Sequence, residues 1–256
     1  MSTTIQRGDQ VVGELLQRIN ALIAEADVTY DEYQAAKQWL IDVGEAGEWP
    51  LLLDVFVEHA VEAQATRRRD GSEGSILGPY HLPDHPFLEP PFELPQRPDE
   101  RGESLWISGR VTSADGRPLP GAVLDLWHAD ADGLYSGFSE LPAGLLRGKV
   151  RADEEGRFAV RTIKPAPYTI PHAGPTGRLI AVCGWHPWRP AHVHLLVTAE
   201  GHEPLVTQLY LDDSEYLDGD IAGAVKPSLV VHPQPVGDHL EFEYEFRLAP
   251  APSAAA

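Results

Sequence analysis

The sequence has a single cysteine, Cys183, in 256 residues, which excludes an internal disulfide framework and a site built on several thiolates. It has no apolar run of membrane-spanning length, and its first residues lack the apolar core of a signal peptide. Basic residues are also scarce: 20 Lys and Arg against 39 Asp and Glu give a formal charge of −19. Such a charge argues against nucleic acid and anionic membranes as partners. We therefore expect a cytoplasmic protein that neither binds nucleic acid nor inserts into a membrane.

Residues 1–65 are predicted to be helical. Apolar residues recur at spacings of three and four between Val12 and Ile23, which is typical of an amphipathic helix. The run Thr29-Tyr-Asp-Glu32 is a capping box that predicts the start of a second helix, and Gly44 marks its end. A third helix is expected from Leu51 to about Ala63. Helices of this length cannot bury their apolar residues alone, so we predict packing on the rest of the chain and on a second copy of it.

A proline-rich segment, residues 66–103, connects the helices to a β-rich region, residues 104–248. The segment contains Gly78-Pro79-Tyr80 among apolar residues, which favours an ordered crossing over a flexible linker. The β-rich region has short runs of apolar and polar residues separated by turn residues, typical of an antiparallel β-sandwich. The expected strands are residues 105–111, 122–127, 157–163, 179–182, 192–197, 205–211 and 240–246. The tail, residues 249–256, has little to bury and is predicted to be disordered.

The run His192-Val193-His194 begins one of the expected strands. Side chains two apart on a strand share a face, so both imidazoles point the same way from backbone positions roughly 7 Å apart. Such a pattern alone is more often an ordinary surface alternation than a metal site. However, tyrosines recur beside glycine and proline at Tyr135 and Tyr168, whereas carboxylates do not cluster near the histidines. A phenolate is an unusual ligand for zinc or magnesium but suits a hard, highly charged ion such as Fe(III).

The order of these residues resembles a known family. Arg189-Pro-Ala-His-Val-His194, preceded by Pro167-Tyr168-Thr-Ile-Pro171 and by Asp132-Gly-Leu-Tyr135, is similar to the motifs of the intradiol ring-cleavage dioxygenases. Within that family the chain resembles the catechol 1,2-dioxygenase branch, especially its chlorocatechol and hydroxyquinol enzymes. The resemblance extends from about residue 10 to about residue 247. It implies a mainly β catalytic core with an N-terminal helical segment that forms a homodimer, with a phospholipid bound at the dimer interface.

The resemblance also implies the reaction and its metal. One Fe(III) per chain and O2 would cleave a catechol between its two hydroxyl groups, giving a cis,cis-muconate; the implied ligands are Tyr135, Tyr168, His192 and His194. Tyr168 would serve first as a ligand and then as a base. Arg189 would stabilise the negative charge that develops on the ring. Gln208 would hold a hydroxide network, the alternative being an ordinary surface amide on a strand.

The substrate pocket is expected from the same resemblance. Asp54 could instead be an ordinary solvated acid, and His128 is left out because resembling enzymes often carry histidine there without binding metal through it. Relatives have an acidic residue after Tyr-x-Ile-Pro-x, where this chain has His172-Ala173, which leaves the preferred ring substituents open. The expected pocket residues are Leu53, Asp54, Val55, Ile76, Gly78, Pro79, Tyr80, Ile170, Pro171, Arg189 and Ala222.

Three alternatives stay open on the sequence. Within the family, a hydroxyquinol 1,2-dioxygenase would give maleylacetate instead of a muconate. From other classes, the chain could be a metal-free β-sandwich binding module, or a zinc or copper hydrolase that uses the His-x-His pair. Iron content and colour distinguish these, because charge transfer from phenolate to Fe(III) makes a concentrated protein wine-red.

Overall fold

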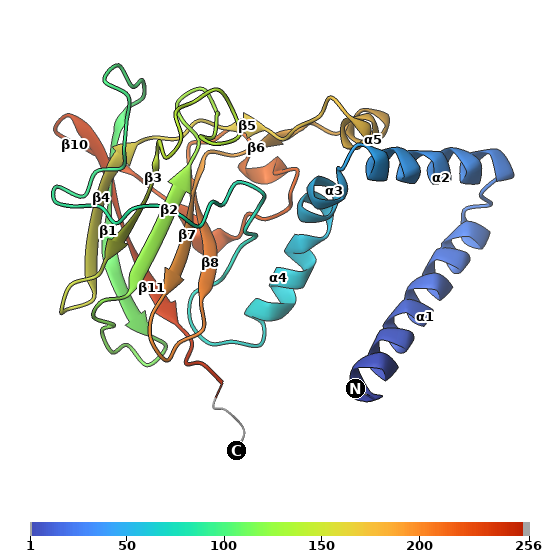
Figure 1. Cartoon of the computed structure of the whole chain (residues 1–256), viewed down its shortest axis with the longest axis horizontal. Coiled ribbons are helices and arrows are strands. Elements are labelled where there is room, and N and C mark those ends of the chain that lie inside the picture. The colour runs from blue at the N-terminus through green and yellow to red at the C-terminus, as the bar shows by residue number, and fades with distance from the viewer. Residues whose placement is uncertain (1, 253–256) are drawn as a thin grey trace. The chain divides into compact units, whose positions relative to one another are not determined.

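Figure 1 shows a computed structural model of the chain, which describes residues 2–252. The chain divides into two compact units, the first ending at Glu48 and the second beginning at Trp49. The sequence analysis placed the end of the helical part at residue 65, and the short helices between the two positions belong to the second unit. Within residues 2–252, no helix is both long enough and apolar enough to span a lipid bilayer.

The first unit consists of two helices, α1 (Ser2–Glu25) and α2 (Tyr30–Glu45). The capping box is confirmed: Thr29 Oγ1 accepts a hydrogen bond from Glu32 N at 3.3 Å, and the Glu32 carboxylate accepts one from Thr29 N at 2.8 Å. Within the first unit, α2 does not cover the apolar stripe of α1. Its exposed members include Val12, Leu15, Leu16, Ile19 and Leu22.

The second unit opens with α3 (Trp49–Phe56) and α4 (Glu58–Thr66). The sequence predicts one helix here, but Val57, with φ −127° and ψ −37°, separates two. Side chains of α4 tie it to the following segment and to the β-rich part: the Glu58 carboxylate accepts from Leu77 N at 2.9 Å, and Glu62 pairs with Lys226. These attachments hold α4 in the second unit, and Val55 of α3 packs in one buried cluster with Trp127 and Tyr168.

Two sheets form the core of the second unit, as the sequence predicts. The four-stranded sheet has the order β10-β11-β1-β4 and the five-stranded sheet the order β3-β2-β7-β8-β9. Strand bounds are β1 Ser104–Ser113, β2 Val123–His128, β3 Arg147–Arg151, β4 Arg157–Ile163, β7 His192–Thr198, β8 Leu205–Leu211, β9 Val230–Val231, β10 Gln234–Val236 and β11 His239–Leu248. Short 3-10 turns cover Leu217–Gly219 and Pro227–Leu229. Buried apolar side chains from both sheets pack together, among them Ile107, Leu124, Leu195 and Phe246.

The mainly β core with N-terminal helices is confirmed, and most strand pairs in it are antiparallel, but two are parallel. β1 pairs with β11 in parallel, and so does β8 with β9. Parallel neighbours need a long connection rather than a hairpin. β1 is the first strand of the β-rich region in the sequence and β11 is the last. The sequence of either strand does not predict this pairing, because the alternation of apolar and polar residues is the same in parallel and in antiparallel strands.

Two further expectations are corrected. Leu179–Val182 is predicted as a strand but is part of a helix, α5 (Pro175–Cys183), which has proline in its first turn and ends before Gly184 with φ +66°. Proline at the start and glycine at the end indicate a helix more strongly than a four-residue apolar run indicates a strand. The start of the predicted disordered tail is hydrogen-bonded instead. Glu203 N donates to Ala249 O and Ala251 N donates to Gly201 O, both at 2.9 Å, because the loop after β7 offers free backbone groups. Residues 253–256 lie outside the described part of the chain.

Candidate metal centre and substrate pocket

The two histidines of the His-x-His pair lie on β7 and share one face of the five-stranded sheet. Val193 and Leu195 alternate with them and belong to the core between the sheets. Nε2 of His192 lies 3.0 Å from Nε2 of His194, and both side chains are almost fully buried. A ring of Trp127 on the neighbouring β2 stacks on His194 with centroids 4.9 Å apart and planes 9° apart. The surface-alternation alternative therefore does not hold.

The two tyrosines reach this pair from separate loops. Tyr168 lies on the two-residue strand β5 (Tyr168–Thr169), which pairs with β6 (Trp188–Arg189). Tyr135 follows a turn after β2, in which Gly133 has φ +80° and a Cβ would come within 2.9 Å of Pro167 O, so only glycine fits. Ring centroids are 5.2 Å apart for Tyr135 and Tyr168, 6.1 Å for Tyr135 and His194, and 5.6 Å for Tyr168 and His192. The structure thus brings the four predicted ligands together.

Burial sets the protonation of these groups. It lowers the pKa of His192 to about 3, with the charge of Arg189 acting in the same direction, and it lowers the pKa of His194 well below its usual range. Both imidazoles are therefore neutral, which is the form that binds a metal. Nδ1 of His192 lies 2.7 Å from Pro190 O and must donate to it, so Nε2 carries the lone pair that can face a metal or accept from Arg189. Burial raises the pKa of Tyr135 and of Tyr168, so without a cation both phenols keep their protons.

The residues present fit a hard trivalent cation. The buried hydroxyl of Tyr135 has no hydrogen-bond partner within 3.5 Å among the described residues, so the site contains a polar atom that the protein alone does not satisfy. No group of three or more His, Cys, Asp or Glu side chains within residues 2–252 could hold a metal ion. A metal bound by the histidine pair would therefore need the phenol oxygens, which favours Fe(III) over zinc.

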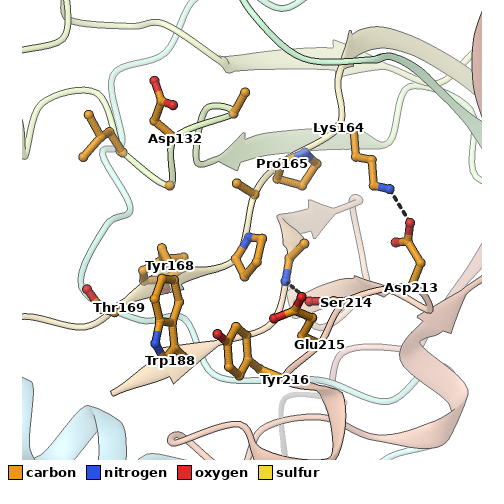
Figure 2. Close-up of a pocket in the computed structure, with 16 residues that line it drawn as sticks. Asp132, Lys164, Pro165, Tyr168, Thr169, Trp188, Asp213, Ser214, Glu215 and Tyr216 are labelled. Carbon is orange, nitrogen blue, oxygen red and sulfur yellow. Dashed lines mark hydrogen bonds and ion pairs between the residues drawn. The ribbon is translucent and has the colours of Figure 1, made fainter. Parts of the chain in front are cut away.

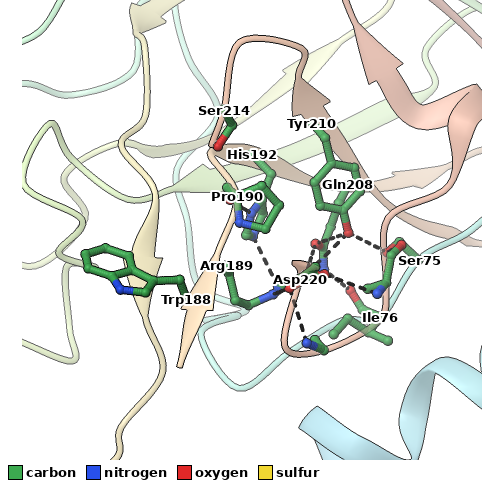
Figure 3. A network of polar contacts seen from close by, with 12 residues as sticks. Ser75, Ile76, Trp188, Arg189, Pro190, His192, Gln208, Tyr210, Ser214 and Asp220 are labelled. Atoms are coloured by element: carbon green, nitrogen blue, oxygen red, sulfur yellow. Dashed lines mark hydrogen bonds and ion pairs between the residues drawn. The ribbon is translucent and has the colours of Figure 1, made fainter. Parts of the chain in front are cut away.

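A buried polar network lies beside these rings (Figure 3). Arg189 donates to both carboxylate oxygens of Asp220, from Nε at 2.9 Å and from Nη2 at 3.0 Å, and the two side chains are 3% and 2% exposed. Burial opposes the ionisation of Asp220, but Arg189 outweighs it and holds the pKa of the carboxyl below its usual value. Arg189 Nη1 lies 3.3 Å from Nε2 of His192, which places the guanidinium at the edge of the candidate metal site.

Gln208 joins the same network from β8, opposite His194. Its side chain is fully buried, which excludes the surface-amide alternative. Nε2 donates to Ile76 O at 2.6 Å, while Oε1 accepts from Arg189 Nη2 at 3.0 Å and from the hydroxyl of Tyr210 at 2.7 Å. The amide thereby links the arginine to the segment that includes Gly78 and Tyr80.

A narrow cavity lies between this segment, α3 and the rings. Its volume is about 20 Å³, far smaller than that of the outer groove beside Tyr168. The lining residues are Leu51, Asp54, Val55, Ile76, Gly78, Pro79, Tyr80, Tyr168, Ile170, Pro171, Arg189 and Ala222. Leu53, predicted for this wall, is 47% exposed and absent from it. Residues three and four apart share a helix face, so Leu51 lines the cavity together with Asp54 and Val55.

A separate open groove of about 590 Å³ borders the other side of Tyr168 (Figure 2). Trp188 and Tyr216 stack in it with centroids 5.0 Å apart, and Lys164 pairs with Asp213 across its rim. Arg189 and Tyr80 line the narrow cavity but not this groove, so the narrow cavity is the better candidate for the reaction.

The sequence analysis missed part of the site. It found no carboxylate near the histidines, but Asp220 lies there, brought in by a loop about 30 residues further along the chain. Tyr210 is also missed, because on β8 it is indistinguishable from a core aromatic. His128 lies outside the group of four: it is buried, with Nδ1 2.7 Å from Ala129 O and Nε2 2.7 Å from Thr162 Oγ1.

Comparison with known proteins identifies the family. A family model described as "Dioxygenase" matches residues 76–250, and one described as "Catechol dioxygenase N terminus" matches residues 6–73. The chain belongs to this dioxygenase family. It is 43% identical to a chlorocatechol 1,2-dioxygenase of Rhodococcus opacus over 87% of this chain and 88% of that protein. A hydroxyquinol 1,2-dioxygenase of a Rhizobium species is 35% identical over 90% and 80%.

The solved structures agree with the sequence comparison. The crystal structure of 3-chlorocatechol 1,2-dioxygenase from Rhodococcus opacus 1CP matches with a TM-score of 0.93 and 47% identity, covering 96% of this dioxygenase and all of that chain. A hydroxyquinol 1,2-dioxygenase from Pseudomonas putida DLL-E4 matches with a TM-score of 0.89 and 31% identity, covering 96% and 93%. Dioxygenases of this family use non-haem iron, which is the metal that the donor set fits.

Proposed function

We propose that this dioxygenase binds one Fe(III) through Tyr135, Tyr168, His192 and His194 and cleaves catechols, including chlorinated ones, to cis,cis-muconates. Both atoms of one O2 enter the product, so no other oxidant is needed. The convergence of two neutral imidazoles and two phenol rings, with neighbouring centroids 4.7 to 6.1 Å apart, carries the proposal. The single cysteine and the lack of a disulfide framework support a reducing compartment such as the cytoplasm.

The residues of the chain have separate roles in this chemistry. Bound Fe(III) supplies a Lewis acid at which a catechol can lose its hydroxyl protons. Tyr168 lines the cavity, so its phenolate can take one of these protons and turn away, which would widen the cavity. Arg189 is held by Asp220 at the edge of the site, where it stabilises negative charge on the ring. Gln208 holds Arg189 beside the cavity wall, because its amide binds both Arg189 and Ile76 O.

The first test is iron and turnover together. Protein expressed in iron-replete medium should contain about one iron per chain, be wine-red, and convert catechol to cis,cis-muconate with consumption of one O2. Tyr135→Phe should lose the colour and most of the iron, because it removes one anionic ligand. Tyr216→Phe is the matched control, since this phenol lies in the outer groove, and it should keep both. Colourless, iron-free wild-type protein would contradict the proposal.

The ring substituents are tested by comparing substrates. Turnover of catechol, 3- and 4-chlorocatechol, methylcatechols and hydroxyquinol should favour catechol or a chlorinated ring over hydroxyquinol. The higher identity to the chlorocatechol enzyme, 43% against 35%, supports this order. Preferential conversion of hydroxyquinol to maleylacetate would instead favour the alternative.

We also propose that the dioxygenase forms a homodimer through α1, with a phospholipid at the interface. The exposed apolar stripe of α1 supports this, since five large apolar side chains are 44% to 62% exposed in one chain. Light scattering should give the mass of a dimer, and mass spectrometry of an organic extract should detect phospholipid. Leu16→Lys combined with Ile19→Lys should give monomers, whereas Gln17→Lys on the same helix should not. A wild-type monomer would contradict the dimer.

A further inference from the structure

Arg147 is a buried guanidinium without a carboxylate partner. It begins β3, is 0% exposed, and forms no ion pair within 4 Å among residues 2–252. Leu146 before it is buried with φ +53°, a conformation that non-glycine residues rarely adopt. A buried charge outside any ion pair and a strained backbone both cost stability, and both concentrate at functional sites. If this position only had to fill space in the core, an apolar side chain would do so without the cost of burying a charge.

The three donors of Arg147 join two segments that are distant in the sequence. Nη1 donates to Tyr80 O at 2.7 Å, Nε donates to Ser136 Oγ at 2.8 Å, and Nη2 donates to Ser136 O at 2.8 Å. Ser136 Oγ in turn donates to Leu145 O at 2.7 Å. The planar fork of a guanidinium can hold such a set of oxygens in one geometry, whereas the single ammonium of lysine cannot.

These two segments carry rings that form the site. Tyr80 lines the cavity and stacks on Tyr135 with centroids 4.3 Å apart and planes 14° apart. Phe138 meets Tyr80 edge-on at 5.1 Å, and the guanidinium carbon lies 5.9 Å from the ring centres of Tyr135 and of Phe138. The relative position of Tyr80 and Tyr135 sets the space between the cavity wall and a candidate metal ligand.

We propose that Arg147 is a positioning residue: it holds Tyr80 against Tyr135 and so sets the width of the substrate cavity. The proposal rests on the proposed function, because the cavity is that of the catechol. It predicts that Arg147 acts through geometry and not through its charge alone. The substituents that the enzyme accepts on the ring then depend on a residue that touches no substrate.

The test compares Arg147→Met and Arg147→Lys with Arg151→Met. Arg151 lies on the same strand but is exposed over Phe87, so its replacement should change nothing. Both Arg147 variants should raise KM for catechol about 10-fold, the lower end of what loss of a supporting side chain costs. They should also shift the phenolate-to-iron absorption band and change the ratio of kcat/KM between 4-chlorocatechol and catechol. A wild-type KM, band and ratio in Arg147→Met, or wild-type behaviour of Arg147→Lys, would overturn the proposal.

A second measurement does not depend on iron or turnover. In the metal-free protein, the near-ultraviolet circular dichroism of the stacked tyrosines should fall in Arg147→Met while the far-ultraviolet signal stays unchanged. If that variant does not fold, Ser136→Ala, which removes one acceptor, should show the same changes in smaller measure. An unchanged near-ultraviolet signal in the folded variant overturns the positioning role even if the dioxygenase is active. If the wild-type protein proves inactive on catechols but Arg147→Met still reduces the near-ultraviolet signal, Arg147 does position Tyr80. The error then lies in the proposed function.

Discussion

Replacing Asp220 by asparagine should destabilise the dioxygenase strongly. The carboxylate is 2% exposed and accepts from Arg189 at 2.9 and 3.0 Å, and also from Ala222 N at 3.2 Å and Ala224 N at 3.1 Å. Asparagine has nearly the same shape but no charge, so Arg189 keeps its charge in a buried site without a counter-charge. No other carboxylate lies within 4 Å of Arg189 in the described part of the chain.

The size of the effect follows from this burial. Removing one partner of a buried ion pair costs about 3–5 kcal/mol, because the remaining charge stays desolvated. For a unit of this size, each kcal/mol lowers the melting temperature by about 2–4 °C, so Asp220→Asn should melt roughly 6–20 °C below the wild type. kcat/KM should fall as well, since the guanidinium is then free to leave the edge of the site.

The assay is urea or thermal unfolding of the metal-free protein, because bound iron would add its own stabilisation. Asp213→Asn is the matched control: its pair with Lys164 is partly exposed, and we expect a loss below about 1 kcal/mol. The double variant Asp220→Leu with Arg189→Met should recover most of the stability, since it leaves no unpaired charge, but it should stay inactive. Two results would each refute the reasoning: a loss of less than about 1 kcal/mol in Asp220→Asn, or a double variant no more stable than Asp220→Asn.

Three further predictions follow from the same site. Gln208→Ala should lower activity by about 10- to 100-fold and leave iron bound, and full activity would refute the role of this amide. Trp127→Leu should weaken Fe(III) binding by about 10-fold in chelator competition, because the Trp127 ring stacks on His194 at 4.9 Å and orients it. Nδ1 of His194 has no hydrogen-bond partner in the described structure that could do so instead. Trp106→Leu, outside the site, is the control. Burial lowers the pKa of His128 to about 4, so the unfolded chain binds this proton below about pH 6.5 and the folded chain only below about pH 4. The free energy of unfolding should therefore fall by up to about 3 kcal/mol more in the wild type than in His128→Gln between pH 7 and 4, and equal pH dependence would contradict this.

The candidate site could be predicted only where its residues stand in recognisable order. His192 and His194 are two apart on a strand, and Tyr135 and Tyr168 follow turns marked by glycine or proline, so motif and alternation place all four. Asp220 has no such marker. It becomes part of the site because a loop after β8 folds back onto β6, a long-range contact that no local pattern encodes. Arg147 is missed for the same reason, since its three acceptors lie on other segments.

The sequence by itself determined the helical start, the capping box at Thr29, most strands and the residue types of the candidate metal site, because these depend on spacing, turn chemistry and ligand preference. Tertiary structure alone decided the parallel pairing of β1 with β11 and the choice of Leu51 over Leu53 for the cavity wall. It also decided which buried charges find a counter-charge: Arg189 pairs with Asp220, whereas Arg147 has no carboxylate within 4 Å in the described part of the chain. Strand direction, helix rotation and charge pairing depend on where distant segments meet, and a local pattern carries no record of that.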